Sequence, residues 1–209
     1  MNWLKKVRKW RWAYTGRKKI RYAILQAHQA HLPIRIILGA GHHRKEENGW
    51  ICTDLPQFDI TRAEHWKSLF QGVNIQAIVA EHVLEHLSYT EIKVALHHAA
   101  QYLEKGAVFR LAVPDKHNPD TLYKEGTKPG GKDIGAHDHK VFLGLEDFDQ
   151  LTEAFYYHER GLEYFDPEGK FHEVPYTDEN GRIVRSNKHR FTYPPIPAYS
   201  SLIVDLIRK

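Results

Sequence analysis

The sequence contains very little cysteine: among its 209 residues there is one, Cys52. A single cysteine excludes an internal disulfide and a thiolate zinc cage, and a reducing compartment is the natural setting for such a chain. Long apolar runs are lacking as well, and none approaches the roughly 20 residues that a membrane-spanning helix needs. The first residues also lack the apolar block of a secretory signal. We therefore expect a cytoplasmic protein, free in solution or peripheral at the inner face of a membrane.

Acidic residues are absent from residues 1–45, which hold twelve Lys or Arg. The remaining residues hold eighteen bases against twenty-six acids, so the two parts carry +12 and −8 within a net charge of +4. In the basic part, Trp3, Trp10 and Tyr14 recur at helical spacing on one side. This pattern predicts an amphipathic helical extension over residues 1–32, in two pieces that break near residues 15–16.

Several interpretations of this extension remain open. Residues 1–30 would suit an anionic membrane surface, with tryptophans at the headgroup level and each Lys or Arg near the surface adding about 1 kcal/mol. RNA phosphates would bind the same charges, although we favour nucleic acid less. Alternatively, the extension is a solvated helix that packs its aromatic side on the domain behind it, since charge runs are usually solvated faces.

Two short strands with a glycine turn follow the extension. Residues 34–38 form a β-branched apolar run that ends on the Gly-Ala-Gly turn of residues 39–41. A buried parallel strand enters a ligand-binding turn in this way, because glycine lets the backbone approach a bound molecule closely. A second strand over residues 50–53 ends on Asp54, where a carboxylate would hold a ribose diol. Since the third glycine of the dinucleotide fingerprint is absent, a plain turn between core strands fits the same residues.

Helical periodicity then alternates with continuous apolar runs: we expect helices over residues 62–70 and 88–103, and strands over residues 75–80 and 107–113. Ser88 begins the second helix, with Glu91 as its capping-box partner. Asp59 would cap a short third strand, whereas Glu81-His82 end the strand of residues 75–80, at the edge where open α/β sheets bind ligands. Strand, helix and strand in this order predict parallel pairing.

The succession of these segments resembles the class I S-adenosylmethionine-dependent methyltransferases, and especially a bacterial group of predicted methyltransferases. The resemblance covers roughly residues 34–209 and rests on GAG (39–41), GWICTD (49–54), IVAEHVLEHL (78–87), YLEKGAVFRLAVPD (102–115) and SLIVDLI (201–207). It implies a Rossmann-like α/β domain over residues 33–209, with a mostly parallel sheet and helices on both faces. It also implies S-adenosylmethionine as the cofactor.

Carried onto matching positions, the resemblance implies a set of cofactor-binding residues: Gly39, Ala40 and Gly41 at the methionine part, Asp54 at the ribose, Asp59 beside the adenine, and Glu81 and His82 near the sulfonium. The crossover between the first two strands departs from the family, because residues 39–49 number only eleven. This length is near the lower limit for a crossover, so the helix that would cradle the cofactor is a single turn. We assign no role to His42 and His43.

A rival motif lies in the same stretch. His82, Glu85 and His86 match the H-x-x-E-H signature of zinc hydrolases, in which two histidines one helical turn apart hold zinc and the glutamate acts as base. Fifteen histidines in the chain make a chance match unsurprising. The signature needs a continuous helix, whereas His82 directly follows a strand end. We therefore expect no metal, and in the methyltransferase interpretation Glu85 and His86 are turn and packing residues.

Candidates for a general base come from the carboxyl ends of the later strands. His82 and Asp115 end two strands, and the long polar segment of residues 116–140 would lie over the same edge. Histidine is the commonest general base in enzymes, so His137 and His139, near the end of that segment, are candidates, but they fit equally well as surface histidines. Nothing in the sequence supports a metal held by these two histidines and Asp115.

The last third of the sequence predicts a helix over residues 145–156, strands over residues 162–165 and 201–207, and a hairpin over residues 171–185 around Glu179-Asn180-Gly181. We expect an enzyme that transfers a methyl group from S-adenosylmethionine to a small-molecule, glycan or lipid-linked acceptor. The alternatives are an RNA methyltransferase that uses the basic extension, a zinc hydrolase, and a non-catalytic scaffold with the cofactor fold.

Overall fold

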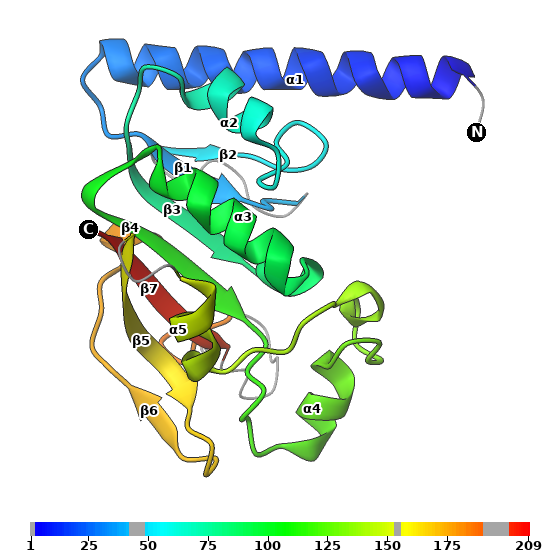
Figure 1. Ribbon diagram of the computed structural model, residues 1–209, viewed down its shortest axis with the longest axis vertical. Helices are drawn as coiled ribbons and strands as arrows, with labels where there is room; N and C mark the ends of the chain where they lie inside the picture. Colours follow the sequence, from blue (N-terminus) through cyan, green and yellow to red (C-terminus); the bar gives the residue numbers. More distant parts are fainter. Residues whose placement is uncertain (1–2, 42–48, 153–155, 190–200) are drawn as a thin grey trace.

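The structure, a computed structural model, describes residues 3–41, 49–152, 156–189 and 201–209, with only the backbone for residues 3–12. Seven strands form one sheet in the order β2-β1-β3-β4-β7-β5-β6 (Figure 1). Their bounds are β1 Arg35–Leu38, β2 Trp50–Cys52, β3 Ile75–Glu81, β4 Leu103–Val113, β5 Tyr157–Phe165, β6 Phe171–Glu173 and β7 Leu202–Arg208.

The helices are α1 Trp3–Gln29, α2 Ala63–Phe70, α3 Tyr89–Ala100, α4 Thr121–Thr127 and α5 Phe148–Leu151, with 3₁₀ turns η1 Leu84–His86, η2 Ala136–Asp138, η3 Leu145–Asp147 and η4 Asp178–Asn180. The predicted capping box of α3 is confirmed. Ser88 Oγ accepts a hydrogen bond from the Glu91 backbone N–H (3.3 Å), and the Glu91 carboxylate accepts from the Ser88 N–H (2.7 Å).

Strand directions bring the ligand-binding ends of the first strands together. β2, β1, β3 and β4 pair in parallel, whereas β7 is antiparallel to both β4 and β5, and β6 is antiparallel to β5. Five of the seven strands therefore point the same way. The carboxyl ends of β1 to β4 meet at one edge of the sheet, as the predicted alternation of strands and helices requires.

The two faces of the sheet are covered differently. Residues such as Ile36 and Ile78 point to one face, where they join a large apolar core with α1, α2, α3 and α5. Ile37 and Val79 point to the other face, whose apolar cluster is closed by the irregular segment of residues 174–189, with Ile183 fully buried. Helices were expected on both faces. Among the described residues, the helices that contribute to these two cores all lie on the first face.

A single helix, α1, stands where two helical pieces were expected, so the prediction of a break near residues 15–16 was wrong. The helix continues through Gly16, where a Cβ would come 2.6 Å from Gln57 Cγ, so a larger residue there would require the Gln57 side chain to shift. Two arginines fasten the helix further: Arg17 donates to the Gln57 carbonyl (2.7 Å) and Arg21 to the Leu69 carbonyl at the end of α2 (2.6 Å). The second half of α1 is thus part of the packed domain.

The expected third strand is absent from the described residues. The chain turns after Asp54, where the Phe58 N–H donates to the Asp54 carbonyl (2.9 Å), and Phe58 packs edge-on against Trp66 of α2 instead. A second boundary also moves, because α3 ends at Ala100 and Leu103 already belongs to β4. In both places, burial of an aromatic or aliphatic side chain in the core determines the local structure.

The hairpin predicted around residues 179–181 was wrong. β6 instead pairs with β5 across a tight turn in which the Asp166 N–H donates to the Lys170 carbonyl (3.0 Å) and Gly169 has a φ of +78°. Residues 174–185 cross the sheet as an irregular segment that contains η4. The segment of residues 116–140 likewise contains α4 and η2, and of the helix predicted over residues 145–156 the structure has η3 and α5, with residues 153–155 outside the described part.

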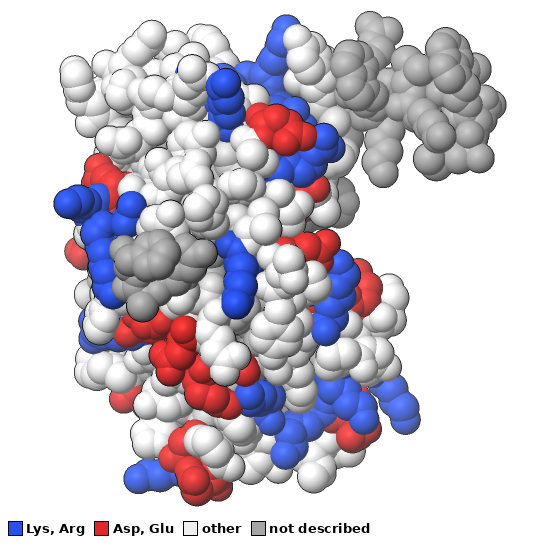
Figure 2. Space-filling model, in the orientation of Figure 1, with Lys and Arg blue, Asp and Glu red and all other residues white. Residues whose placement is uncertain are grey.

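No helix in the described ranges is both long and apolar enough to cross a membrane. The longest, α1, has 27 residues and carries Lys and Arg along its length. On the face of the molecule shown in Figure 2, positive and negative side chains lie interspersed.

Candidate functional site

A cavity of about 360 Å³ opens at the carboxyl edge of β1, β2 and β3. Small-molecule sites in proteins span about 300–1,000 Å³, so the volume suits an organic ligand. Its wall is formed by residues 38–39, 53–55, 58–60, 82–83 and 86–87, at or just after the ends of these three strands, and by Asp138 of η2.

The glycine turn shapes one side of the cavity. Gly39 and Gly41 have φ values of +62° and +59°, a region that favours glycine, and a Cβ on Gly39 would come 2.5 Å from Val83 Cγ2. The Gly41 N–H donates to Asp54 Oδ2 (2.8 Å), while Asp54 Oδ1 accepts from the next backbone N–H (2.7 Å). Ala40 between the glycines is buried. Because a carboxylate has about four acceptor directions, Asp54 keeps capacity for ligand hydroxyls.

Asp59 lies in the loop after β2 and lines the same cavity. Its Oδ1 accepts from both the N–H (3.0 Å) and the hydroxyl (2.7 Å) of Thr61, and its backbone N–H donates to His65 Nδ1 (2.9 Å). Phe58 and Ile60 on either side are buried and give this part of the cavity an apolar wall. A flat, partly polar group would fit between them.

His82 leaves β3 in the left-handed region, with a φ of +55°. Such a conformation costs a non-glycine residue about 1–3 kcal/mol and is concentrated at functional sites. The ring lines the cavity and bridges two elements: Nε2 lies 3.1 Å from Ser201 Oγ, and Nδ1 lies 2.8 Å from Glu85 Oε1. His82 therefore joins the cavity to the turn η1.

Glu81, the neighbour of His82, has a different place. Its carboxylate accepts from the backbone N–H groups of Val184 (3.0 Å) and Arg185 (2.7 Å), and the residue is outside the cavity wall. These bonds hold the segment of residues 174–189 at the end of β3.

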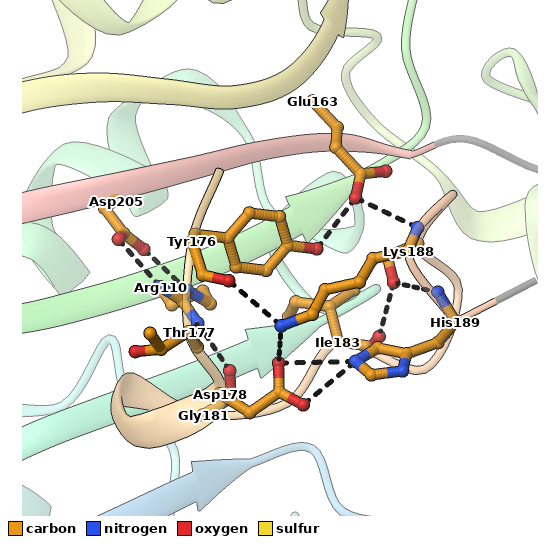
Figure 3. Close-up of polar contacts among 11 residues, drawn as sticks. Arg110, Glu163, Tyr176, Thr177, Asp178, Gly181, Ile183, Lys188, His189 and Asp205 are labelled. Carbon is orange, nitrogen blue, oxygen red and sulfur yellow. Dashed lines mark hydrogen bonds and ion pairs between the residues drawn. The ribbon is translucent and has the colours of Figure 1, made fainter. Parts of the chain in front are cut away.

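A buried polar network anchors the same segment to the sheet (Figure 3). Arg110 of β4 donates Nε and Nη2 to the two oxygens of Asp205 on β7 (2.7 and 2.9 Å). Its Nη1 donates to the carbonyls of Thr177 and Gly181 (2.7 Å each). Arg110 and Asp205 are only 1% and 4% exposed, so this ion pair is shielded from water.

A second carboxylate extends the network. Glu163 of β5 accepts from the Tyr176 hydroxyl (2.7 Å) and from the Asn187 backbone N–H (2.6 Å). Burial, with the nearby charge of Glu163, raises the pKa of Tyr176, which keeps the phenol protonated. Figure 3 also shows Lys188 beside Asp178, its Nζ 2.7 Å from Oδ1. These hydrogen bonds attach the irregular segment of residues 174–189 to the sheet.

The structure separates the four candidate bases. Asp115 is fully buried outside the cavity wall, and its oxygens accept from the backbone N–H groups of His117 (2.9 Å) and Phe165 (2.8 Å). Burial raises the pKa of Asp115 despite these bonds. His137 is exposed on η2. Asp115 thus links the end of β4 to β5, away from the cavity.

His139 and His82 both approach the same oxygen of Glu85, Oε1. Its Nδ1 is 2.7 Å from the Thr127 carbonyl and its Nε2 is 4.0 Å from Glu85 Oε1. The ring meets that of His86 edge-on, with centroids 4.8 Å apart. Burial acts to raise the pKa of Glu85, but the charge and contact of His82 outweigh it, so the pKa lies below its usual value.

Glu85, His86 and Asp138 are residues at or beside the cavity that the sequence analysis did not include among the site residues. The H-x-x-E-H and H-D-H runs were the available signals. The helix that the zinc-hydrolase signature requires is not formed, because His82 directly follows β3 and His86 lies in the 3₁₀ turn η1. The predicted geometry of that motif is therefore absent, although its side chains cluster.

No family model matches the sequence, and no curated protein matches it. Among solved structures, the chain is similar to an S-adenosylmethionine-dependent methyltransferase from Thermotoga maritima, described as a possible histamine N-methyltransferase: identity 12%, TM-score 0.48, with 99% of this chain and 96% of that chain covered. It is also similar to an S-adenosylmethionine-dependent methyltransferase from Archaeoglobus fulgidus (12%, TM-score 0.47, 92% and 93% covered). A third is the magnesium protoporphyrin IX methyltransferase of Synechocystis PCC 6803 with bound S-adenosylhomocysteine (10%, TM-score 0.43, 100% and 89% covered).

Since these TM-scores lie below 0.5, the assignment of the fold rests on the sheet itself. Parallel strands β2, β1, β3 and β4 continue into β7 and β5, with β7 inserted antiparallel between two strands of the common direction. This is a Rossmann-like α/β sheet, and the described residues form no strand outside β2. The chain has that fold.

Proposed function

We propose that this protein is an S-adenosylmethionine-dependent methyltransferase. The observation that carries the proposal is the cavity at the carboxyl edge, where the glycine turn of residues 39–41 is hydrogen-bonded to Asp54. Open α/β sheets bind ligands at this edge, and a glycine turn beside a strand-end carboxylate suits a nucleoside that carries a charged chain.

The proposed cofactor contacts follow the order of the strands: Gly39, Ala40 and Gly41 at the methionine part, Asp54 at the ribose hydroxyls, Asp59 with Phe58 and Ile60 at the adenine, and His82 at the sulfonium end. Glu81 enters the proposal as a positioning residue, because its carboxylate holds backbone N–H groups beside the cavity.

In the proposed reaction, a lone pair of the acceptor attacks the methyl carbon while the carbon–sulfur bond breaks and its electron pair stays on sulfur. The sulfonium is already activated, so orientation of the two reactants supplies most of the rate enhancement. A hydroxyl or amine acceptor also loses a proton to a base. We propose His82 for this step rather than Asp115, His137 or His139, because His82 lines the cavity and the other three candidates are outside its wall.

We further propose a small-molecule or glycan acceptor, including a lipid-linked one, for the domain of residues 33–209, with residues 1–32 as an element that approaches anionic membranes. Tyr14, Lys18 and Tyr22 support this proposal, since they are exposed at successive turns of α1 and Lys18 Nζ lies 4.5 Å from the Tyr14 ring. Flotation with phosphatidylglycerol vesicles should retain the wild type, and Lys18→Glu should weaken retention. Equal behaviour on neutral vesicles would count against this role.

Calorimetric titration of S-adenosylmethionine and S-adenosylhomocysteine tests the cofactor. We expect saturable binding that Asp54→Ala weakens by about 1–3 kcal/mol, or roughly 5- to 150-fold, because a hydrogen-bonded charged partner is lost. Asp149→Ala is the control, since Asp149 is a carboxylate in a second cavity of about 360 Å³ at the opposite end of the sheet order, beside α5 and β5. Absence of binding would favour a non-catalytic scaffold, and equal weakening in both variants would place the ligand elsewhere. Unchanged thermal unfolding should accompany both variants.

A further inference from the structure

Three potential metal ligands converge beside the cavity: Glu85 and His86 of η1, and His139, which follows η2. One donor atom from each lies within 4.8 Å of the other two. Two imidazoles and one carboxylate form a donor set that divalent transition metals favour, and three protein ligands are typical of zinc sites that keep a coordination position for substrate.

The hydrogen bonding of this cluster points the same way. Glu85 is only 1% exposed; its Oε1 lies 2.8 Å from His82 Nδ1, whereas its Oε2 has no hydrogen-bond partner among the described residues. His86 Nδ1 is also buried without one, although Asp138 Oδ1 lies 2.9 Å away at ion-pair distance. Buried polar atoms nearly always have a partner, so the buried Oε2 of Glu85, in a carboxylate whose ligand atom lies within 4.8 Å of two imidazoles, points to a ligand that accepts lone pairs.

Backbone contacts hold the ligands in place. The Glu85 carbonyl accepts from the N–H groups of Lys140 (2.7 Å) and Val141 (3.3 Å), which fixes the chain after His139 against η1. Because the Thr127 carbonyl can only accept, the Nδ1 of His139 carries the proton and its Nε2 presents a lone pair on the side of Glu85. A metal-binding histidine is oriented by this kind of outer contact.

We propose that Glu85, His86 and His139 bind one divalent transition-metal ion, with Zn²⁺ as the best-matched species, at the wall of the cavity. This ligand set differs from both sets that the sequence suggested, one through His82 and the other through His137 and Asp115. His82 takes the role of an outer partner, because its Nδ1 contacts Glu85 Oε1 at 2.8 Å.

The position of the ion determines what it would bind. His86 lines the cavity, so a fourth coordination position would face the ligand space rather than the protein interior. An acceptor with a hydroxyl or carboxylate oxygen suits that position, since zinc polarises bound oxygen and lowers the pKa of a bound O–H. This consequence rests on the proposed methyl transfer, whereas metal binding itself does not.

Titration of Zn²⁺ into the chelator-treated full chain tests the site, with isothermal calorimetry as the readout. A parallel titration with Co²⁺ instead of Zn²⁺ is monitored by visible absorption. We expect one tight site in the wild type. His139→Ala should weaken it by more than the roughly 10- to 100-fold that loss of an outer partner costs. His137→Ala is the matched control, because it removes an exposed histidine two positions away and should leave the tight site intact.

Several outcomes would overturn the proposal. The proposal fails if the wild type does not bind Zn²⁺ tightly, or if His139→Ala binds Zn²⁺ as tightly as the wild type. It also fails if His139→Ala and His137→Ala lose Zn²⁺ affinity to the same extent. Glu85→Gln is a second variant, and its Zn²⁺-dependent rise in melting temperature should vanish if it folds. Tight Zn²⁺ binding without any binding of S-adenosylmethionine would uphold the metal site and refute the proposed function.

Discussion

The buried ion pair of Arg110 and Asp205 allows a sharp test of how the irregular segment is held. Asp205→Asn keeps the shape of the side chain but removes its charge, so the guanidinium stays buried without a counter-ion. Arg110→Met removes more: it leaves the Asp205 carboxylate unpaired and takes the donor away from the carbonyls of Thr177 and Gly181.

The expected magnitude follows from burial. Breaking a buried pair by removing one partner costs about 3–5 kcal/mol. In a domain of this length each kcal/mol lowers the melting temperature by about 2–4 °C, so Asp205→Asn should lose roughly 6–20 °C. Arg110→Met should lose more, because each buried carbonyl left without a donor adds about 1–3 kcal/mol.

Urea unfolding gives the free energies, and hydrogen exchange over residues 174–189 shows where the loss acts. Glu64→Gln is the control, because Arg62 and Glu64 form an ion pair whose side chains are 55% and 60% exposed. An exposed pair contributes about 0–1 kcal/mol. If Asp205→Asn cost no more than Glu64→Gln, burial of the pair would not be what anchors the segment, and the reasoning would fail.

Three further predictions concern the glycine turn, a helix cap and acid stability. Gly39→Ala should lower the unfolding free energy by about 1–3 kcal/mol and abolish cofactor binding in calorimetry, because the alanine would combine a left-handed φ with a clash against Val83. Gly41→Ala meets no described atom within 4 Å, so it should lower the unfolding free energy only by the cost of the left-handed φ, about 1–2 kcal/mol. Ser88→Ala should lose about 1 kcal/mol in urea unfolding, the usual value of an N-cap. Burial raises the pKa of Glu146, but hydrogen bonds from its cationic partners outweigh this and bring it to about 2, below the usual 4.5. Its stabilising effect should therefore be complete above pH 4.5 and be lost towards pH 2; solvent exposure limits it to about 1 kcal/mol, and Glu146→Gln should flatten urea-measured stability over that range.

Apolar runs and caps predicted most of the sheet, because strands buried on both faces leave a strong local signal. The break expected in α1 shows the limit of such signals. A glycine inside a helix costs about 1 kcal/mol, so Gly16 favours a break when the helix is considered alone. In the structure the helix continues, held by the contacts of Arg17 and Arg21, and Gly16 packs against the side chain of Gln57, forty-one positions away.

The prediction for the segment after β6 was wrong for a related reason. Glu179-Asn180-Gly181 has the composition of a hairpin turn, yet a Cβ on Gly181 would lie 2.9 Å from Val79 Cβ. Glycine is needed there because the chain passes close over the sheet, and Ile183 then fills its second face. Local composition cannot distinguish a glycine that turns from a glycine that lets two chains touch.

For the candidate site, the sequence indicated strand ends but not the partners that meet there. Asp54 and the glycine turn follow predicted strands, and the structure joins them by a hydrogen bond. Glu85 and His139 are more than fifty positions apart and come together through the bond between the Lys140 N–H and the Glu85 carbonyl. No periodicity encodes a contact between a 3₁₀ turn and a long loop.

The central place of β7 has a consequence for the order of folding. This strand lies between β4 and β5 and, among the described strands, joins the parallel part of the sheet to the hairpin of β5 and β6. During folding, β4 and β5 each keep one edge unpaired until residues 202–208 pair with both. Unpaired edges recruit strands of other chains, so the folding chain is prone to association until β7 has paired.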